Sequence, residues 1–431
     1  MVADVLIRHG KIERIGTLPS NLSFDQEIDL TGKWLVPGLI DDQVHFREPG
    51  LTHKATIGSE ARAAVAGGVT SFMEMPNTQP PAVNLPTLEA KYARAAETSL
   101  ANYSFFFGAT NHNLEAIKSI DPHQVCGVKI FMGSSTGDML VDNPGTLEGI
   151  FQNCPTLIAT HCEDTPMIKQ AEAAAKARWG EEVPAGEHPH IRSAEACYAS
   201  SSLAVALARR HQARLHILHI TTAKELSLFS NAPLANKRLT SEACVHHLWF
   251  AEEDYARLGH KIKCNPAIKT QADRDAVRAA VASGVIDVIA TDHAPHTREE
   301  KAQSYFKAPS GLPLVQHSLL ILLELAKQGA IPLETAITRA CHAPAELFGI
   351  VNRGYIREGY WADLVVVNPQ ATTTVSAENT LYQCGWSPLE GQRFSHQIER
   401  TFVNGNCVYE NGRVHDHAPR GQRLTFNGNA R

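Results

Sequence analysis

Short runs rich in β-branched and aromatic residues alternate with longer amphipathic stretches through most of this 431-residue chain. Helix-like segments such as 193–211 and 271–283 separate several of the runs. The eight runs are Leu35–His45, Val69–Met75, Asn102–Ala109, Val125–Met132, Leu157–His161, Leu215–Ile220, Leu239–Ala243 and Val285–Thr291. Strands that alternate with helices form parallel sheets, because each helix returns the chain to the edge where the next strand starts. Eight such units predict an α/β fold of the (β/α)8 or TIM-barrel type.

The two ends of the chain have a different pattern. Residues 2–32 consist of short strand-like pieces broken by glycines and Pro19, and strand-like runs return after Gly354. Turn signals such as Asn404-Gly405 separate the later runs. Chain ends often lie close together, so both ends can build one small β-sandwich. We therefore expect a β-sandwich domain from residues 1–35 and 355–431, beside a catalytic barrel of residues 36–354.

Composition excludes several classes of protein. The chain has 40 Lys and Arg against 45 Asp and Glu, with no basic tract, which argues against nucleic-acid and membrane-surface partners. Asp4 and Arg8 interrupt the only apolar stretch at the N-terminus, and polar residues interrupt the most apolar helical stretch, 312–328. The nine cysteines include no Cys-x-x-Cys pair and are typical of reduced thiols. We expect a cytoplasmic protein that acts on a small molecule.

Polar residues stand at or near the ends of five predicted strands. In a (β/α)8 barrel the catalytic side chains lie at the carboxyl ends of the strands. Imidazole and carboxylate groups are the usual ligands of Zn²⁺ and similar ions, and this chain holds 21 histidines. The pattern predicts a metal site at the barrel mouth, and its residues are His45, Lys129, His161, His219 and Asp292.

Longer motifs surround these five residues and cover nearly the whole chain. Together they resemble the amidohydrolase superfamily and, within it, the dihydroorotases. The motifs are Leu35-Val36-Pro37-Gly38-Leu39-Ile40-Asp41, Val44-His45-Phe46-Arg47-Glu48-Pro49-Gly50, Met75-Pro76-Asn77-Thr78, Gly127-Val128-Lys129-Ile130-Phe131-Met132, Thr160-His161-Cys162-Glu163, Leu218-His219-Ile220, Asn265-Pro266, Thr291-Asp292-His293-Ala294-Pro295-His296 and Gly359-Tyr360-Trp361-Ala362-Asp363-Leu364-Val365.

The resemblance implies one or two Zn²⁺ ions per chain, bridged by a carboxylated Lys129. By this analogy His161 and His219 bind the more exposed ion, and His45 binds the more buried one together with Asp292. Asp292 is also the implied general base and acid. The family's His-x-His motif at the first strand reads Gln43-Val44-His45 here. A glutamine carbonyl is a poorer ligand than imidazole, so we expect fewer than two metal ions per chain.

The resemblance also implies a grip on a carboxylate substrate. Arg47, Asn77 and His296 match the dihydroorotase positions that hold the carboxylate, and Asn265 is the implied partner of the ring amide. Arg47 has an alternative interpretation as an ion pair with Glu48 or another carboxylate, and Asn265 as a turn residue before Pro266. The loop 304–313 is expected to close over the ring. The implied reaction interconverts dihydroorotate and N-carbamoyl-L-aspartate in pyrimidine (UMP) biosynthesis.

Two other functions remain open on the sequence. One is a related cyclic amidohydrolase, either a hydantoinase (dihydropyrimidinase) or an allantoinase. The other is a non-catalytic dihydroorotase-like subunit that scaffolds aspartate transcarbamoylase, to which only Gln43 points. A homo-oligomer is expected in either case.

Two further motifs are expected to have no catalytic role. Residues 133–137 fit Gly-x-Ser-x-Gly, but loop-like residues follow where a serine-hydrolase elbow needs a helix. His246 and His247 lie beside aromatic residues beyond the seventh strand, where we expect a structural or hydrogen-bonding role.

Overall fold

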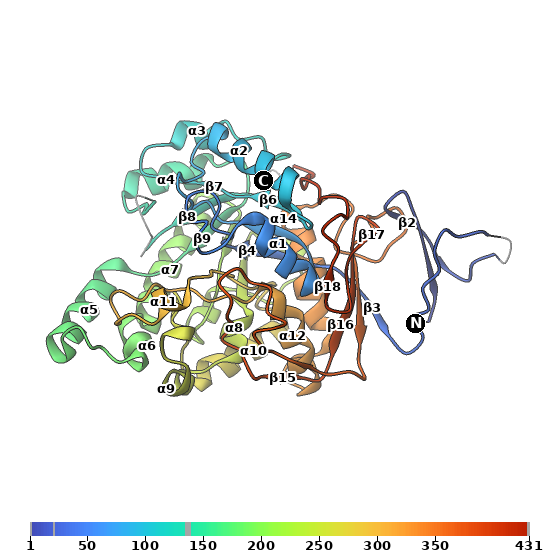
Figure 1. Ribbon diagram of the computed structural model, residues 1–431. Helices are drawn as coiled ribbons and strands as arrows, with labels where there is room; N and C mark the ends of the chain where they lie inside the picture. Colours follow the sequence, from blue (N-terminus) through green and yellow to red (C-terminus); the bar gives the residue numbers. More distant parts are fainter. Residues whose placement is uncertain (1, 20–21, 134–138, 429–431) are drawn as a thin grey trace.

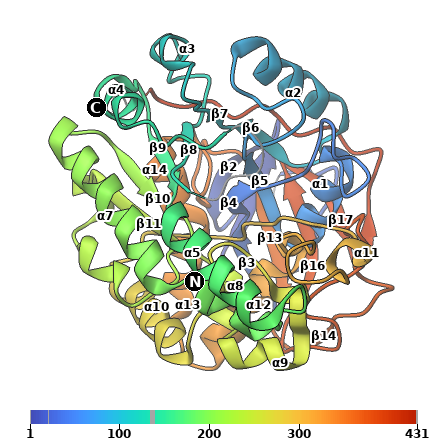
Figure 2. The same ribbon diagram turned by 90° about the vertical axis from the view of Figure 1, so that its left-hand side faces the viewer.

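The computed structural model describes residues 2–19, 22–133 and 139–428. It confirms the predicted (β/α)8 barrel, in which helices surround a ring of parallel strands (Figure 2). Three strands form one arc in the order β4-β5-β6, and the other arc runs β7-β8-β9-β10-β11-β12. Their bounds are β4 Leu39–Val44, β5 Val69–Glu74, β6 Asn102–Phe105, β7 Phe107–Gly108, β8 Val128–Phe131, β9 Ile158–His161, β10 Leu215–Ile217, β11 Leu239–Cys244 and β12 Val288–Ala290.

Main-chain hydrogen bonds close the barrel between the last strand and the first. The His45 N–H donates to the carbonyl of His293 at 2.7 Å, next to a parallel bridge between Val44 and His293. On the other side of the ring, the two arcs are continuous along the chain, because Phe106 alone separates β6 from β7. Closure therefore brings the carboxyl ends of β4 and β12 into contact.

The helices lie outside this ring, and their N-termini follow the strand ends. Side chains of Thr56, Asn84, Asn143, Asp164 and Ser193 cap five of the longer helices, as short polar residues do at such positions. The bounds are α1 Ile57–Ala66, α2 Leu85–Thr98, α3 Leu114–Lys118, α4 Pro144–Asn153, α5 Thr165–Trp179, α6 His188–Ile191, α7 Ala194–His211, α8 Val245–Trp249, α9 Tyr255–Leu258, α10 Gln271–Ser283, α11 Arg298–Lys301, α12 Ser318–Lys327, α13 Leu333–Ile337 and α14 Ala343–Phe348. Within the described residues, no helix has both the length and the apolar character needed to cross a bilayer.

The predicted first run, Leu35–His45, divides at Gly38 into two strands of different sheets. β3 (Trp34–Pro37) pairs with β13 (Leu364–Asn368) outside the barrel, and β4 starts directly after the glycine. A Cβ atom at position 38 would lie 2.1 Å from Thr70 Oγ1 on β5, so only glycine lets the chain pass so close.

Both chain ends build the smaller β-structure beside the barrel (Figure 1). Its five-stranded sheet has the order β18-β17-β16-β13-β3, with β16 Gln397–Val403, β17 Asn406–Glu410 and β18 Arg413–Val414. The hairpin of β1 (Asp4–Arg8) and β2 (Lys11–Gly16) packs on it through an apolar cluster that includes Ile12 and Leu364. A short pair, β14 (Thr373–Thr374) and β15 (Arg393–Phe394), completes the strands. The division into domains at residues 35 and 355 stays a proposal.

Two parts of the C-terminal segment contact the barrel itself. Leu424 and Phe426 are buried against barrel residues such as Phe106. The indole N–H of Trp386 donates to the carbonyl of His296 at 2.8 Å. Residues assigned from sequence to the sandwich thus also support the barrel and the segment that follows β12.

Candidate active site at the barrel mouth

Three residues at the strand ends adopt a left-handed backbone conformation that few non-glycine residues take. Arg47 follows β4, His219 follows β10 and Asp292 follows β12, with φ values of +68°, +42° and +48°. Such conformations cost roughly 1–3 kcal/mol each and persist where the surrounding structure holds them in place. All three residues belong to the predicted site, so the surrounding structure holds their backbone in a strained conformation that orients these side chains.

His45 and Asp292 form the first contact of the predicted site. The Nδ1–H of His45 donates to Asn77 Oδ1 at 2.9 Å, and His45 Nε2 lies 3.1 Å from Asp292 Oδ1. Burial lowers the pKa of His45, with Asp292 opposing the shift, so the ring is neutral at neutral pH. In this arrangement the Nε2 lone pair faces a carboxylate oxygen. Two facing acceptors attract a cation, as a metal-ligating pair does.

His161 and His219 form the second contact. His161 Nε2–H donates to Glu163 Oε2 at 2.9 Å, which leaves Nδ1 facing His219 Nε2 at 3.0 Å. Arg192 also binds Glu163. Burial opposes ionisation of Glu163, but Arg192 and His161 outweigh it and lower its pKa to about 2. The ionised carboxylate therefore fixes the orientation and tautomer of His161, which is the usual support of a metal-binding histidine.

Lys129, on β8, lies within electrostatic range of both pairs. Its charge contributes to lowering the pKa of His45 and of His219, and Asp292 acts on Lys129 in turn. The side chain is only 1% exposed, and burial lowers the pKa of Lys129 to about 8. Among the described residues no carboxylate comes within ion-pair distance of Nζ, which lies 4.7 Å from the centroid of the Phe131 ring.

These donors fit a divalent metal ion. Each pair offers a neutral imidazole nitrogen, and the first adds a carboxylate oxygen, which together are typical zinc ligands. Within the described parts of the chain no direct contact joins the two pairs, and the charge of Lys129 acts on a histidine of each.

Gln43, which stands where the family has a histidine, is turned towards β11. Its Oε1 accepts a hydrogen bond from the Cys244 thiol at 3.7 Å, and the side chain is 1% exposed. Glu242 Oε1, 3.3 Å from the same sulfur, is an alternative acceptor for the single thiol proton. The glutamine amide is thus committed to a partner inside the barrel.

Arg47 is a buried cation beside His296. Its Nε donates to the Pro295 carbonyl at 3.1 Å, and Nη2 lies 3.1 Å from His296 Nε2. The side chain is 7% exposed, and burial lowers its pKa to about 10, so the guanidinium stays charged at neutral pH. Glu48 pairs instead with Arg94 at 2.7 Å. Within the described residues Arg47 forms no ion pair, so the alternative interpretation of Arg47 is wrong for Glu48.

Lys54 and the loop 304–313 complete the surroundings of His296. Lys54 Nζ donates to His296 Nδ1 at 2.9 Å, so the Nε2–H of the ring donates to the carbonyl of Ser310 at 3.0 Å. Lys301 donates to the carbonyls of Pro309 and Gly311, at 2.8 and 2.9 Å. The loop expected to close over a substrate is therefore already tied down beside the site.

Asn265 has an amide oxygen available for a ligand. Its Oδ1 is buried and accepts no hydrogen bond from the described residues. Buried polar atoms are nearly always paired, so an orphan at the mouth points to a missing donor. An N–H group of a bound molecule would supply such a donor.

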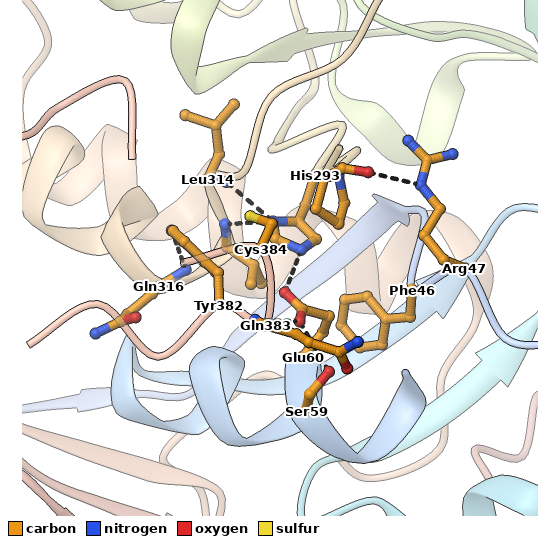
Figure 3. A network of polar contacts seen from close by, with 12 residues as sticks. Phe46, Arg47, Ser59, Glu60, His293, Leu314, Gln316, Tyr382, Gln383 and Cys384 are labelled. Atoms are coloured by element: carbon orange, nitrogen blue, oxygen red, sulfur yellow. Dashed lines mark hydrogen bonds and ion pairs between the residues drawn. The ribbon is translucent and has the colours of Figure 1, made fainter. Parts of the chain in front are cut away.

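Several supporting residues escaped the sequence reasoning. His293 accepts hydrogen bonds at Nδ1 from the N–H groups of Leu314 and Val315, so its Nε2–H donates to Glu60 Oε2 at 2.8 Å (Figure 3). The carboxylate of Asp41 accepts from the hydroxyl of Thr291 at 2.6 Å. These contacts hold the segment that bears Asp292. Asp41, Thr291 and His293 lie in quoted motifs and Glu60 lies outside them, and in each case only burial and the partner reveal the role.

The two motifs set aside above have different outcomes. Residues 134–137 of the Gly-x-Ser-x-Gly match lie outside the described residues. His247 Nε2 hydrogen-bonds to the carbonyl of Pro266 at 3.1 Å, in line with the predicted hydrogen-bonding role.

Comparison with known proteins shows that the chain belongs to the amidohydrolase family. A model of the amidohydrolase family matches residues 34–408. A dihydroorotase of Halobacterium salinarum is 33% identical over 421 residues, which cover 96% of this chain and 94% of the relative. An allantoinase of Bacillus velezensis is 30% identical, covering 95% and 91%. The solved L-hydantoinase (dihydropyrimidinase) of Arthrobacter aurescens superposes with a TM-score of 0.93 at 26% identity, covering 98% and 96%.

Proposed function

Because this chain belongs to the amidohydrolase family, we propose that it is a dihydroorotase. It interconverts dihydroorotate and N-carbamoyl-L-aspartate, a step of pyrimidine biosynthesis, by reversible hydrolysis of a cyclic amide.

The unpaired charge of Arg47 carries this proposal. A buried guanidinium without a carboxylate partner is costly, because charge leaves water without compensation. A substrate carboxylate supplies the missing partner through a charge-assisted, bidentate contact. Dihydroorotate has such a group, whereas hydantoin and dihydrouracil do not. Asn77 and His296 belong to the same grip, since they contact His45 and Arg47 directly.

We assign the metal ligands to His45, Lys129, His161, His219 and Asp292, with Lys129 carboxylated and one or two Zn²⁺ ions per chain. A carbamate on Lys129 offers two anionic oxygens, and the lowered pKa of the amine favours the neutral form that reacts with CO2. When bound, the metal supplies a hydroxide at neutral pH and polarises the carbonyl of the ring.

The chain's own groups position the substrate and move the proton. Asp292 accepts a proton from the attacking water and delivers it to the departing ring nitrogen, and in cyclisation the same group works in reverse. Asn265 Oδ1 accepts the ring N–H, and Arg47 holds the carboxylate so that the carbonyl stays within attack distance. Asp292 is 8% exposed, so bulk water has little access to the reacting atoms.

Hydantoinase or allantoinase activity is the second candidate, because relatives of both kinds resemble this chain closely. The test assays the purified protein, after metal analysis, with dihydroorotate, hydantoin and allantoin. We expect turnover of dihydroorotate by a metal-loaded protein and little of the others. Preference for a ring without a carboxylate would refute the assignment.

The remaining expectations follow from this function. Cytoplasmic location, homo-oligomerisation and association with aspartate transcarbamoylase stay predictions. A purely scaffolding subunit has no physical need for the strained Asp292 or the supported His161, so a catalytic role is favoured.

A further inference from the structure

Three ionisable side chains meet inside the barrel, below the candidate active site. Asp42 on β4, His216 on β10 and Glu242 on β11 are all fully buried. His216 Nε2 lies 3.4 Å from Asp42 Oδ2 and 3.6 Å from Glu242 Oε2, and the three ligand atoms lie within 4.8 Å of one another. We call these three residues the interior triad. His216 precedes His219 by three positions, which corresponds to about 10 Å along a strand.

Four polar atoms of the interior triad have no hydrogen-bond partner within the described residues. These atoms are both carboxylate oxygens of Asp42, Glu242 Oε2 and His216 Nε2. A buried acceptor without a donor costs roughly 1–3 kcal/mol, and more when it is charged. One such atom from each of the three residues lies within 4.8 Å of the others, and this clustering points to a missing cation.

Thr240 determines what His216 presents to the carboxylates. The hydroxyl of Thr240 donates to the Leu215 carbonyl at 3.2 Å, so its oxygen accepts the Nδ1–H of His216 at 2.9 Å. Nε2 therefore faces the carboxylates either with a lone pair or with a second proton. Burial acts to lower the pKa of His216, but Asp42 and Glu242 outweigh it and raise the pKa to about 9.

A proton on His216 compensates one of the two carboxylates, and because burial and Asp42 raise the pKa of Glu242 to about 7, a second proton can neutralise the other. A divalent ion compensates both while the imidazole stays neutral, which leaves no net charge in the barrel interior. Burying an uncompensated charge is the most expensive alternative. One divalent ion therefore balances the charge that otherwise requires a proton on His216 and another on Glu242.

The spacing of the three atoms also suits an ion. In tetrahedral zinc sites with bonds of ~2.1 Å, neighbouring ligand atoms lie ~3.4 Å apart. The measured separations of 3.4 and 3.6 Å match this spacing and are poorly aligned for hydrogen bonds. A point roughly 2.0–2.4 Å from all three atoms exists between them. One imidazole and two carboxylates are ligands for Zn²⁺ and, less strongly, for Mn²⁺.

We propose that Asp42, His216 and Glu242 bind a divalent metal ion, with Zn²⁺ the best fit, at a structural site distinct from the candidate active site. The ion holds Glu242 in place, and the other oxygen of Glu242 accepts the main-chain N–H of His219 at 3.2 Å. The site therefore stabilises the strained backbone of a predicted active-site ligand from below.

Anomalous diffraction tests the proposal on the intact protein. Crystals of the wild-type chain are soaked with excess Zn²⁺, and data are collected on both sides of the zinc absorption edge. We expect an anomalous peak between Asp42, His216 and Glu242, separate from any peak near His161. Zinc at the mouth with no peak between these three residues would overturn the proposal and show that a protonated His216 occupies the place of the ion. The map separates the two sites, so the result is independent of the substrate.

Asp42→Asn provides the matched solution test. Asparagine keeps the size of the side chain and removes one charge, and Asp42 accepts no hydrogen bond from described residues that the change could break. We expect one zinc ion per chain fewer by elemental analysis and a smaller rise in Tm on adding Zn²⁺. The control is Asp287→Asn, since Asp287 already pairs with Lys237 at 2.8 Å. Equal zinc content in wild type and Asp42→Asn would contradict the proposal.

Discussion

His45 presents Nε2 to Asp292 Oδ1 at 3.1 Å, because the Nδ1–H of its ring donates a hydrogen bond to Asn77 Oδ1. Asn77, which follows β5, thus sets the tautomer of His45, which follows β4. As a result, the Nε2 lone pair of His45 faces the carboxylate of Asp292, which follows β12. Such an arrangement is stable only with a proton or a metal ion between the two groups. The pair therefore requires a bound cation, and variants of the surrounding residues can test which cation it is.

Arg47→Ala should lower kcat/KM for dihydroorotate by roughly 100-fold, because hydrogen bonds to a charged group contribute about 1.5–3 kcal/mol. Steady-state kinetics measure the change, and most of it should appear in KM. The control is Arg210→Ala, an exposed residue on α7 that pairs with Glu148. Turnover that barely changes in Arg47→Ala would show that the guanidinium does not hold the substrate carboxylate.

Gln43→His should raise the number of metal ions at the barrel mouth. Imidazole is a stronger ligand than an amide carbonyl, and the wild-type amide is occupied by Cys244. Anomalous maps count ions at the mouth separately from the interior triad. A full complement of two ions at the mouth of the wild-type protein would refute this expectation.

Lys129→Ala should abolish retention of metal at the mouth and lower activity by about 100-fold or more, since even supporting residues of metal sites cost 10–100-fold. Growth with ¹³C-labelled bicarbonate and NMR should reveal a carbamate carbon in the wild type that is missing in the variant. Lys224→Ala is the control, because that lysine is exposed. Unaltered metal content in Lys129→Ala would exclude Lys129 as a ligand.

Glu163 should contribute a pH-dependent part of the stability. Its pKa is lowered from 4.5 to about 2 in the folded protein because Arg192 and His161 outweigh the effect of burial. A lowered carboxylate pKa stabilises the fold above the unfolded value, and this contribution is lost as the pH falls from 4.5 towards 2. The full contribution is roughly 3 kcal/mol.

The measurement compares wild type with Glu163→Gln by denaturant unfolding at pH 7 and pH 3.5. The difference in unfolding free energy should be largest at pH 7 and shrink at pH 3.5. A difference that stays constant across this range would mean that the pKa of Glu163 is not lowered.

Much of the fold follows from local patterns that the sequence displays directly. The eight predicted runs each contain a barrel strand, because buried parallel strands need continuous apolar residues wherever they lie. The division at Gly38 was missed, since the apolar pattern of 35–44 continues across it. Only the approach of Thr70 from β5 makes a glycine necessary at that position.

The candidate site divides in the same way. Motifs and strand ends pointed to His45, His161 and Asp292, since the linear sequence shows both the residue type and its position at the end of a predicted strand. The supporting roles of Glu163 and Glu60 were not visible, because each depends on a partner that is distant in sequence or hidden by burial.

The sequence by itself determined the (β/α)8 barrel, because hydrophobic periodicity encodes it, and its motifs supplied the groups proposed for the barrel mouth. The tertiary structure decided which of these groups face one another. Among the described residues, Glu48 pairs with Arg94 and Arg47 has no ion-pair partner. The fold also brought Asp42, His216 and Glu242 together from three strands. The physical reason is that the cost of a buried charge depends on its neighbours in space, and barrel closure alone sets those neighbours.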